Sequence, residues 1–281
     1  MQREATMVSI RPDEYRAFQD FLRQACGIML GSGKEYLITS RLSGLMAEIG
    51  VDSFAGLLER LRSVGQTQLK VRVIDAMTTN ETFWFRDISH FELLKGQLLP
   101  ELNARIGGSI RIWSAACSSG QEPYNISMVV EDYQRSSVSE RKRPVEILAT
   151  DISTKVLEEA RQGVYCGMSI DRGLTTEQHR RYFITRDNCL EVRPEIRHRV
   201  RFRELNLTNE FESLGRFDAI FCRNVLIYFS NELKRDIVNR LARALNPGGY
   251  LFLGSTESIN QLTDRFQMQL SGGGISYRLK D

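Results

Sequence analysis

Four polar side chains stand where apolar, strand-like stretches of the sequence end. Glu122 follows the stretch IRIW and a loop of small residues at 114–120. Asp151 ends the stretch VEILAT, and the pair Arg223 and Asn224 interrupts the apolar run FDAIFCRNVLIYF. Ligands of open parallel sheets bind outside the carboxyl ends of the strands, so we expect these side chains to face one ligand. An acid after the second strand is the group with which nucleoside-binding sheets of this kind bind a ribose.

Most of these residues also have a purely structural interpretation. Small residues suit any tight turn from strand to helix, and the loop at 114–120 lacks the G-x-G-x-x-G pattern. Asp151 would also serve as the cap of the next helix, and Asn206, after a third strand end, would suit an ordinary turn. The Arg223–Asn224 pair is harder to explain in this way, because burying it without partners costs several kcal/mol. We therefore expect that pair to face a cleft or a ligand.

The elements that must position these residues follow two patterns. Apolar residues recur at helical spacing between 13 and 75, which predicts an all-helical domain over residues 1–75. Over residues 76–281, strand-like runs alternate with helical stretches, which predicts a doubly wound α/β domain. Short alternating runs interrupt this second pattern and predict an inserted antiparallel β-subdomain over residues 163–203. The strand-like runs of the main sheet lie at 110–116, 145–152, 217–229 and 249–256.

Composition and charge narrow the class of protein. Hydrophobic residues make up 42% and charged residues 26% of the chain, as in ordinary globular proteins. No window approaches the ~18 consecutive apolar residues of a membrane helix, and no secretory signal is visible. We therefore expect a cytoplasmic protein without membrane insertion. The net charge of +3 is too small to imply a nucleic-acid partner, although five arginines lie within residues 193–203.

The cysteines and histidines predict neither a disulfide framework nor a metal site. No two cysteines form a C-x-x-C pair, so we expect reduced thiols, mostly buried. The three histidines form no cluster with cysteine or aspartate, so no metal is expected. The cysteines are Cys26, Cys117, Cys166, Cys189 and Cys222.

Six motifs along the chain together resemble the chemotaxis receptor methyltransferase (CheR-type) family. They occur in order from the N-terminal part to the last strands, and the order makes the resemblance specific. The motifs are TNETFWFR at 79–86, WSAACSSGQEPY at 113–124, ATDI at 149–152, NL at 206–207, FDAIFCRNVLIYF at 217–229, and PGG at 247–249.

The resemblance implies S-adenosylmethionine as the cofactor and S-adenosylhomocysteine as its product. Asn80, Thr82 and Arg86 match the residues that reach the methionine end, with Arg86 as partner of its carboxylate. The family usually has phenylalanine where Trp84 stands and glutamate where Gln121 stands, two conservative departures. The other cofactor contacts that the resemblance implies are Glu122 for the amino group, Asp151 for the ribose, Asn206 and Leu207 for the adenine, and Arg223 and Asn224 beside the sulfonium.

The resemblance also implies the reaction, which is methylation of glutamate side chains on bacterial chemoreceptors to form methyl esters. Arg223 and Tyr228 would be the catalytic residues, and Tyr228 would border the transferred methyl group. A glutamate carboxylate with a pKa of ~4.3 is already ionised at neutral pH, so no general base is required. Catalysis would then come from positioning and from the removal of water.

The predicted partner is the cytoplasmic helical region of the receptor. Lys34 and Arg41 lie about two helical turns apart on one face, and they match basic positions with which the family holds this region. A third basic position matches Ala47, which puts that contact in doubt. Some members also bind a receptor pentapeptide through a glycine-containing loop of the inserted sheet. The corresponding loop, residues 184–190, is short and lacks glycine, which predicts independence from the pentapeptide.

Two other functions remain open at this point. One is a regulator that binds S-adenosylmethionine or its product without transferring a methyl group. The other is a nucleic-acid methyltransferase, suggested by the arginines of residues 193–203. Such enzymes commonly carry an N/D-P-P-Y/F tetrapeptide after the fourth strand, where this chain has Arg-Asn-Val-Leu.

Overall fold

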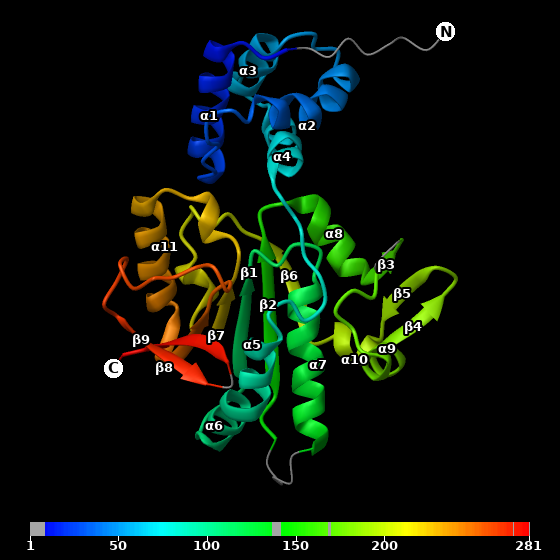
Figure 1. Ribbon diagram of the computed structural model, residues 1–281, viewed down its shortest axis with the longest axis vertical. Coiled ribbons are helices and arrows are strands. Elements are labelled where there is room, and N and C mark those ends of the chain that lie inside the picture. Colours follow the sequence, from blue (N-terminus) through cyan, green and yellow to red (C-terminus); the bar gives the residue numbers. More distant parts are fainter. Residues whose placement is uncertain (1–8, 137–141, 168–169, 272, 281) are drawn as a thin grey trace.

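Four helices form the N-terminal part of the chain. The computed structural model describes residues 9–136, 142–167, 170–271 and 273–280. The helices pack around a core of their own, which includes Phe18, Leu42 and Phe54. They stand together at the top of Figure 1, above the larger α/β part. Their bounds are α1 (Pro12–Cys26), α2 (Glu35–Glu48), α3 (Phe54–Arg62) and α4 (Thr67–Met77).

Glycine and serine residues set the ends of these helices. Helix α2 stops before Gly50, whose φ is 67°, and Ser53 caps α3 by accepting a hydrogen bond from the Gly56 N–H at 3.2 Å. Helix α1 ends at Gly27 in the left-handed conformation, with φ 76°. A Cβ atom at Gly27 would lie 2.5 Å from the side chain of Leu233. The glycine therefore allows the end of α1 to approach the α/β part closely.

A seven-stranded sheet forms the centre of the α/β part, in the order β6-β2-β1-β7-β8-β10-β9. The first five strands in that order are parallel, and β10 is antiparallel to both of its neighbours. The strands are β1 (Ile110–Ala115), β2 (Val145–Asp151), β6 (Val200–Glu204), β7 (Phe217–Cys222), β8 (Leu245–Phe252), β9 (Phe266–Ser271) and β10 (Gly274–Leu279).

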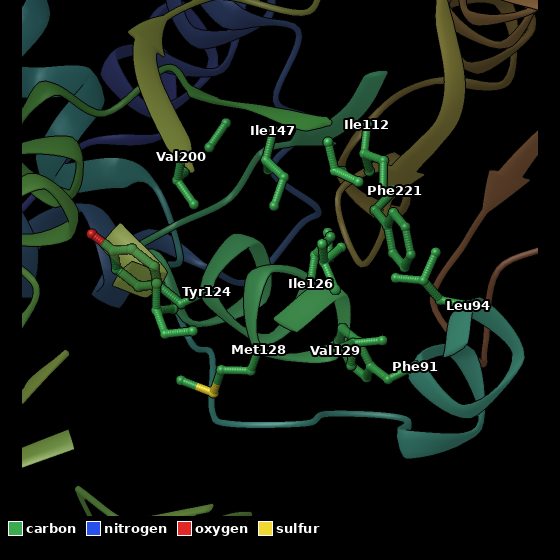
Figure 2. Packing of buried hydrophobic residues seen from close by; sticks show 14 of the residues in the cluster. Phe91, Leu94, Ile112, Tyr124, Ile126, Met128, Val129, Ile147, Val200 and Phe221 are labelled. Atoms are coloured by element: carbon green, nitrogen blue, oxygen red, sulfur yellow. The ribbon is translucent and has the colours of Figure 1, made fainter. Parts of the chain in front are cut away.

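Two apolar clusters of buried residues flank this sheet. In the first, strand residues such as Ile112 and Ile147 meet Ile126 and Val129 of α7, while Phe91 adds an aromatic ring from α5 (Figure 2). The second cluster packs α11 against the sheet. The helices of this part are α5 (Ile88–Leu93), α6 (Leu99–Ala104), α7 (Gln121–Ser136), α8 (Thr154–Gln162), α9 (Thr176–Tyr182), α10 (Pro194–Arg197) and α11 (Asn231–Arg243), with shorter turns η1 (Leu94–Leu98), η2 (Glu212–Leu214) and η3 (Leu226–Tyr228). The predicted fold class, an all-helical domain followed by a doubly wound α/β domain, is confirmed.

A small antiparallel sheet projects from the side of the α/β part (Figure 1). Its strands are β3 (Val164–Cys166), β4 (Phe183–Arg186) and β5 (Cys189–Val192), in the order β3-β5-β4. The prediction of an inserted antiparallel sheet is correct, but its extent to residue 203 is wrong. Residues 200–204 form β6, which pairs in parallel with β2 at the edge of the central sheet. An edge strand with one solvated face alternates like a hairpin strand, which explains the error.

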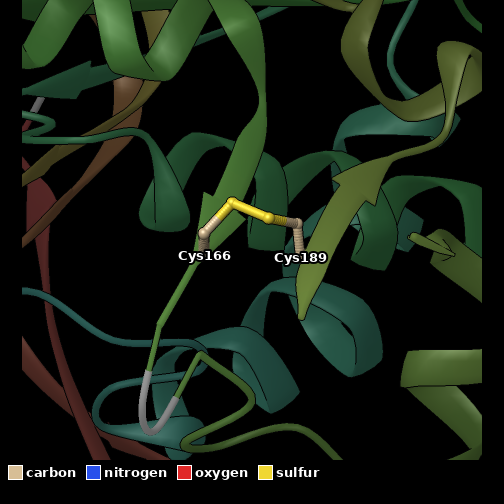
Figure 3. The surroundings of a disulfide bond; sticks show 2 residues. All are labelled: Cys166 and Cys189. Carbon is tan, nitrogen blue, oxygen red and sulfur yellow. A yellow bond between two sulfur atoms is a disulfide. The ribbon is translucent and has the colours of Figure 1, made fainter. Parts of the chain in front are cut away.

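The prediction that all cysteines are reduced is also wrong. Cys166 and Cys189 form a disulfide across the small sheet (Figure 3). The two residues lie directly opposite each other in the β3–β5 pairing, with Cα atoms 4.2 Å apart. The other cysteines, Cys26, Cys117 and Cys222, are buried and free.

Within the described residues, no helix is both long and apolar enough to cross a membrane. The same residues contain no group of three or more histidine, cysteine, aspartate or glutamate side chains arranged to hold a metal ion.

Candidate active site

A cavity lies between the helical part and the carboxyl ends of the central strands. Its walls come from α1 and α2, from the segment 77–86, and from the loops that follow β1, β2, β6 and β7. Every residue to which the sequence assigned a role lines this cavity: Lys34, Arg41, Asn80, Thr82, Arg86, Glu122, Asp151, Asn206, Leu207, Arg223, Asn224 and Tyr228. The binding roles of these residues remain predictions.

Parallel pairing explains why these residues meet. Strand β1 pairs with β2 on one side and with β7 on the other, and β6 extends the row beyond β2. Because the four strands run in the same direction, their carboxyl ends open onto one edge of the sheet. Glu122 in the first turn of α7, Asp151 at the end of β2 and Arg223 after β7 are therefore neighbours.

Arg223 joins three of the cavity walls. One of its terminal nitrogens donates to Glu122 Oε2 at 2.9 Å, and the other donates to Asp87 Oδ2 at 2.7 Å and to the Arg86 carbonyl at 2.6 Å. Its side chain is only 3% exposed. Glu122 also accepts a hydrogen bond from the Ser114 hydroxyl at 2.7 Å. The guanidinium therefore fixes the positions of its neighbours, and its terminal nitrogens are already occupied.

Asp151 orders the loop between β1 and α7. One oxygen of its carboxylate accepts the Ser118 N–H at 2.8 Å and the other accepts the Ser153 N–H at 2.9 Å. Burial raises the pKa of Asp151 above its usual value, although these backbone hydrogen bonds oppose the rise. Ser153, and not Asp151, caps α8 by accepting the Val156 N–H. The Ser118 hydroxyl in turn donates to the Asn80 carbonyl at 2.8 Å, so Asp151 supports two walls of the cavity.

Arg86 differs from Arg223 because its charge is not paired. Within the described part of the chain its guanidinium makes no ion pair, and it donates only to the Glu81 carbonyl at 3.3 Å. Its position over the Phe83 ring, 5.8 Å from the centroid, holds it beside the cavity. A half-buried, unpaired cation that lines a cavity is suited to bind a carboxylate of a ligand.

Asn206 and Arg41 make hydrogen bonds that the sequence did not predict. The Asn206 amide donates to the Ala25 carbonyl at 2.8 Å and its oxygen accepts the Thr208 N–H at 3.0 Å, so the side chain connects the end of β6 to α1. Arg41 donates to the carbonyls of Met77 and Thr78 and to the hydroxyl of the next residue, at 2.8–3.2 Å. Both side chains therefore hold the two parts of the chain together around the cavity.

Asn125 is a cavity residue that the sequence interpretation missed. Its side chain is fully buried in α7, and neither its amide nitrogen nor its amide oxygen has a hydrogen-bond partner among the described residues. An unpaired buried amide costs free energy unless a ligand or water satisfies it. The available signal was a polar residue on a helix face that is otherwise apolar, between Tyr124 and Ile126. This amide, together with the unpaired Arg86, fits a ligand with charged and polar groups.

His90 lies near the Arg223 cluster without the properties of a general base. The residue is 3% exposed, and burial together with the nearby Arg223 charge lowers the pKa of His90 to about 4. The imidazole is therefore neutral at physiological pH. It packs against Phe252, with ring centroids 5.5 Å apart, as part of the wall behind Arg223.

Comparisons with known proteins cover both parts of the chain. Residues 13–78 match the model of the all-alpha domain of CheR methyltransferases, and residues 80–272 match the model of the SAM-binding domain of the same family. Chemotaxis protein methyltransferase 1 of Pseudomonas aeruginosa is 49% identical over 272 residues, which cover 95% of this chain and 98% of that protein. Chemotaxis protein methyltransferase Cher2 of Pseudomonas putida is 46% identical, with coverage of 95% and 98%. Chemotaxis protein methyltransferase of Vibrio parahaemolyticus is 45% identical, with coverage of 98% and 100%.

Proposed function

The chain belongs to the CheR methyltransferase family, and we propose on this premise that it methylates glutamate side chains of bacterial chemoreceptors in the cytoplasm. S-Adenosylmethionine is its cofactor, since residues 80–272 match the SAM-binding domain of the family. The observation that carries the proposal is one cavity that brings together the residues to which the resemblance assigns a role. The relatives are named methyltransferases, and a binding-only role has no support among them.

Several side chains of the cavity fit the polar ends of this cofactor. Arg86 would pair with the carboxylate of the methionine end, and Asn80 and Thr82 would contact the same end. Asp151 still has lone pairs for ribose hydroxyls, because each of its oxygens accepts only one N–H in the described structure. Leu207 is buried and apolar, as a wall for the adenine ring requires, while the Asn206 amide, already bonded to Ala25, would contribute through its remaining lone pair or its backbone.

When bound, the cofactor supplies a methyl group on a positively charged sulfur. The protein needs no base to activate the acceptor, because a glutamate with a pKa of ~4.3 is ionised at neutral pH. Tyr228 and Asn224 line the cavity on the side of β7, where they would orient the acceptor carboxylate. Arg223 would hold Glu122 and Asp87 in place beside them, since these two carboxylates occupy its terminal nitrogens. Positioning of this kind is worth up to ~7 to 11 kcal/mol of the barrier.

In the division proposed from the sequence, the helical domain comprises residues 1–75 and would hold the receptor. Residues 76–281 would carry the cofactor. Lys34 is exposed at the start of α2 and makes no ion pair within the described residues, so it is free to bind an acidic helix. Arg41 lies on the same face, but its hydrogen bonds to the segment after α4 leave less of its guanidinium for a partner. We therefore assign the larger share of receptor binding to Lys34.

We also propose that the small sheet does not require a receptor pentapeptide. Arg186 pairs directly with Cys189, so only Asp187 and Asn188 form the turn between β4 and β5. This two-residue turn leaves no glycine-containing loop to hold an extended peptide. Calorimetric titration with the pentapeptide should detect no binding, and micromolar affinity would contradict the proposal.

Transfer of a tritiated methyl group from S-adenosylmethionine to receptor-containing membranes tests the main proposal. The label should appear in the receptor and leave as methanol on mild base treatment, because a methyl ester is base-labile. Membranes in which the receptor glutamates are replaced by alanine are the matched control. Label that stays on the receptor after base, or no label at all, would refute glutamate methylation.

A further inference from the structure

Glu257 links the loop after β7, which borders the cavity, to the loop after β8. One oxygen of its carboxylate accepts the backbone N–H groups of Asn224 at 2.7 Å and Gly254 at 2.8 Å. The other oxygen accepts the Ile227 N–H at 3.2 Å. Hydrogen bonds to an ionised acceptor are roughly twice as strong as neutral ones. A single side chain therefore ties the loop after β7 to the loop after β8.

The loop after β7 needs such support because its backbone is unusual at Asn224. This residue has a φ of 58°, in the left-handed region that costs a non-glycine residue about 1 kcal/mol or more. Its side chain lies close against Gly254, where a Cβ atom would come within 2.4 Å of the Asn224 amide nitrogen. The Asn224 N–H bond to Glu257 and this tight contact hold the strained residue in place.

The supported loop is the one that carries Asn224 and Tyr228 into the cavity. Glu257 itself does not line the cavity, and it makes no ion pair with any described lysine or arginine. Its charge is therefore balanced by backbone N–H groups alone. The amide of glutamine would replace one acceptor oxygen with a donor, which would point an N–H group at another N–H group.

We propose that Glu257 is a positioning residue for methyl transfer, which acts by fixing Asn224 and Tyr228 through the backbone of their loop. The role rests on the proposed methyltransferase function. Glu257 lies in the loop after β8, whereas the site residues predicted from the sequence all lie earlier in the chain. The carboxylate is required for its two acceptor oxygens rather than for contact with substrate.

Steady-state methylation of receptor-containing membranes by the full chain tests this role in Glu257→Gln. We expect kcat to fall by roughly 10-fold or more, the equivalent of about 1.4 kcal/mol in the barrier. KM for the receptor should stay within about 2-fold of the parent value, because the substitution leaves Lys34, the proposed receptor contact, in place. Glu212→Gln is the control, since Glu212 does not line the cavity and its half-exposed carboxylate pairs with Arg243 and accepts the neighbouring Phe211 N–H. A parent-like kcat, or a loss shared equally by the control, would overturn the proposal.

Amide hydrogen exchange with S-adenosylhomocysteine bound gives a readout that does not depend on receptor methylation. Residues 224–227 should exchange faster in Glu257→Gln than in the parent, while the strands of the sheet stay protected. Unchanged exchange in this loop would also overturn the proposal. A parent chain that methylates no receptor would refute the proposed function instead. If Glu257→Gln does not fold, Glu257→Asp takes its place. Aspartate keeps the charge but is too short to reach all three N–H groups, so we expect a smaller fall in kcat.

Discussion

Replacement of Arg223 by methionine should destabilise the protein strongly, and the structure allows the size of the effect to be worked out. The guanidinium is 3% exposed and lies between two carboxylates, Asp87 at 2.7 Å and Glu122 at 2.9 Å. Methionine fills a similar volume without the charge, so the two carboxylates would face each other unpaired. Removal of one partner of a buried charge network costs about 3 to 5 kcal/mol. We expect a loss of that size in the free energy of unfolding at neutral pH.

The pH dependence of this loss distinguishes an electrostatic cause from poor packing. Burial raises the pKa of Asp87, but the hydrogen bond and the charge of Arg223 outweigh burial and bring the pKa below its usual value. In the parent, the stability from this pair is therefore present above the unfolded pKa of ~3.9 and is lost as the pH falls through the lower folded pKa. In Arg223→Met the carboxylate of Asp87 loses its cation, so its protonation on acidification relieves the repulsion. The difference between parent and variant should therefore shrink as the pH falls from neutral to about 4.5.

Urea unfolding followed by circular dichroism at both pH values measures this difference. Arg243→Met is the matched control, since Arg243 is half exposed and its ion pair with Glu212 is 3.5 Å long. Exposed pairs contribute about 0 to 1 kcal/mol, so the control should unfold like the parent. The reasoning would be refuted by a change below about 1 kcal/mol in Arg223→Met, or by a larger change that is the same at both pH values.

Three further predictions concern residues outside this cluster. Asn125→Leu should weaken S-adenosylhomocysteine binding about 10-fold, measured by calorimetry, because the buried amide has no partner among the described residues and is left to a ligand. The melting temperature of the cofactor-free chain should not decrease. Unchanged affinity would exclude a cofactor contact. Lys34→Glu should raise KM for the receptor several-fold at constant cofactor affinity. Arg41→Met should also lower the free energy of unfolding by about 1 to 2 kcal/mol, because it loses three hydrogen bonds to the end of α4 and the segment that follows. Cys189→Ser should lower the free energy of unfolding of the oxidised chain by about 3 kcal/mol, since the cross-link with Cys166 spans 23 positions. A reductant should abolish the difference between parent and variant. Equal stability without reductant would mean that the bond does not form in solution.

The sequence predicted the strands of the central sheet because buried parallel strands are nearly continuous apolar runs. Residues 110–116 and 145–152 correspond to β1 and β2 within one residue at each end. The run 217–229 extends past the end of β7 at Cys222, the run 249–256 begins inside β8 (Leu245–Phe252), and no run was assigned to β9 or β10. The edge strand β6 was assigned to the wrong sheet. Its residues Arg201 and Arg203 are exposed, and its alternation is that of a half-solvated strand. Alternation records which face is buried, not which neighbour the strand pairs with, so the sequence could not separate β6 from the small sheet.

The disulfide was hidden for a related reason. Counting and spacing of cysteines describe local motifs, whereas Cys166 and Cys189 are brought together by the register of β3 and β5. That register depends on the turn at Asp187 and Asn188, which pairs Arg186 with Cys189. A change of one residue in this register would move each side chain to the other face of the sheet. The sequence thus predicted the small sheet, but not the pairing that creates the bond.

The candidate site shows a similar division between side chains and their partners. Parallel strands placed Glu122, Asp151 and Arg223 at one edge of the sheet, which the sequence could predict from the strand ends alone. The contacts that join the α/β part to the helical domain around the cavity could not be predicted, because they connect residues far apart in the chain. The Asn206 amide binds the Ala25 carbonyl, and the Met29 N–H binds the Tyr228 carbonyl at 2.8 Å.

These contacts change how the helical domain should be understood. Besides the Met29 bond, Asp75 at the end of α4 accepts both the N–H and the hydroxyl of Thr154 at 3.1 Å, at the start of α8. Residues from α1, α2 and the following loops also line the cavity that holds the cofactor residues. The helical domain is therefore a wall of the proposed cofactor site as well as the proposed receptor contact. Because this wall is shared, we expect substitutions within α2 to change both receptor binding and cofactor binding. A substitution at the exposed Lys34 should change receptor binding only.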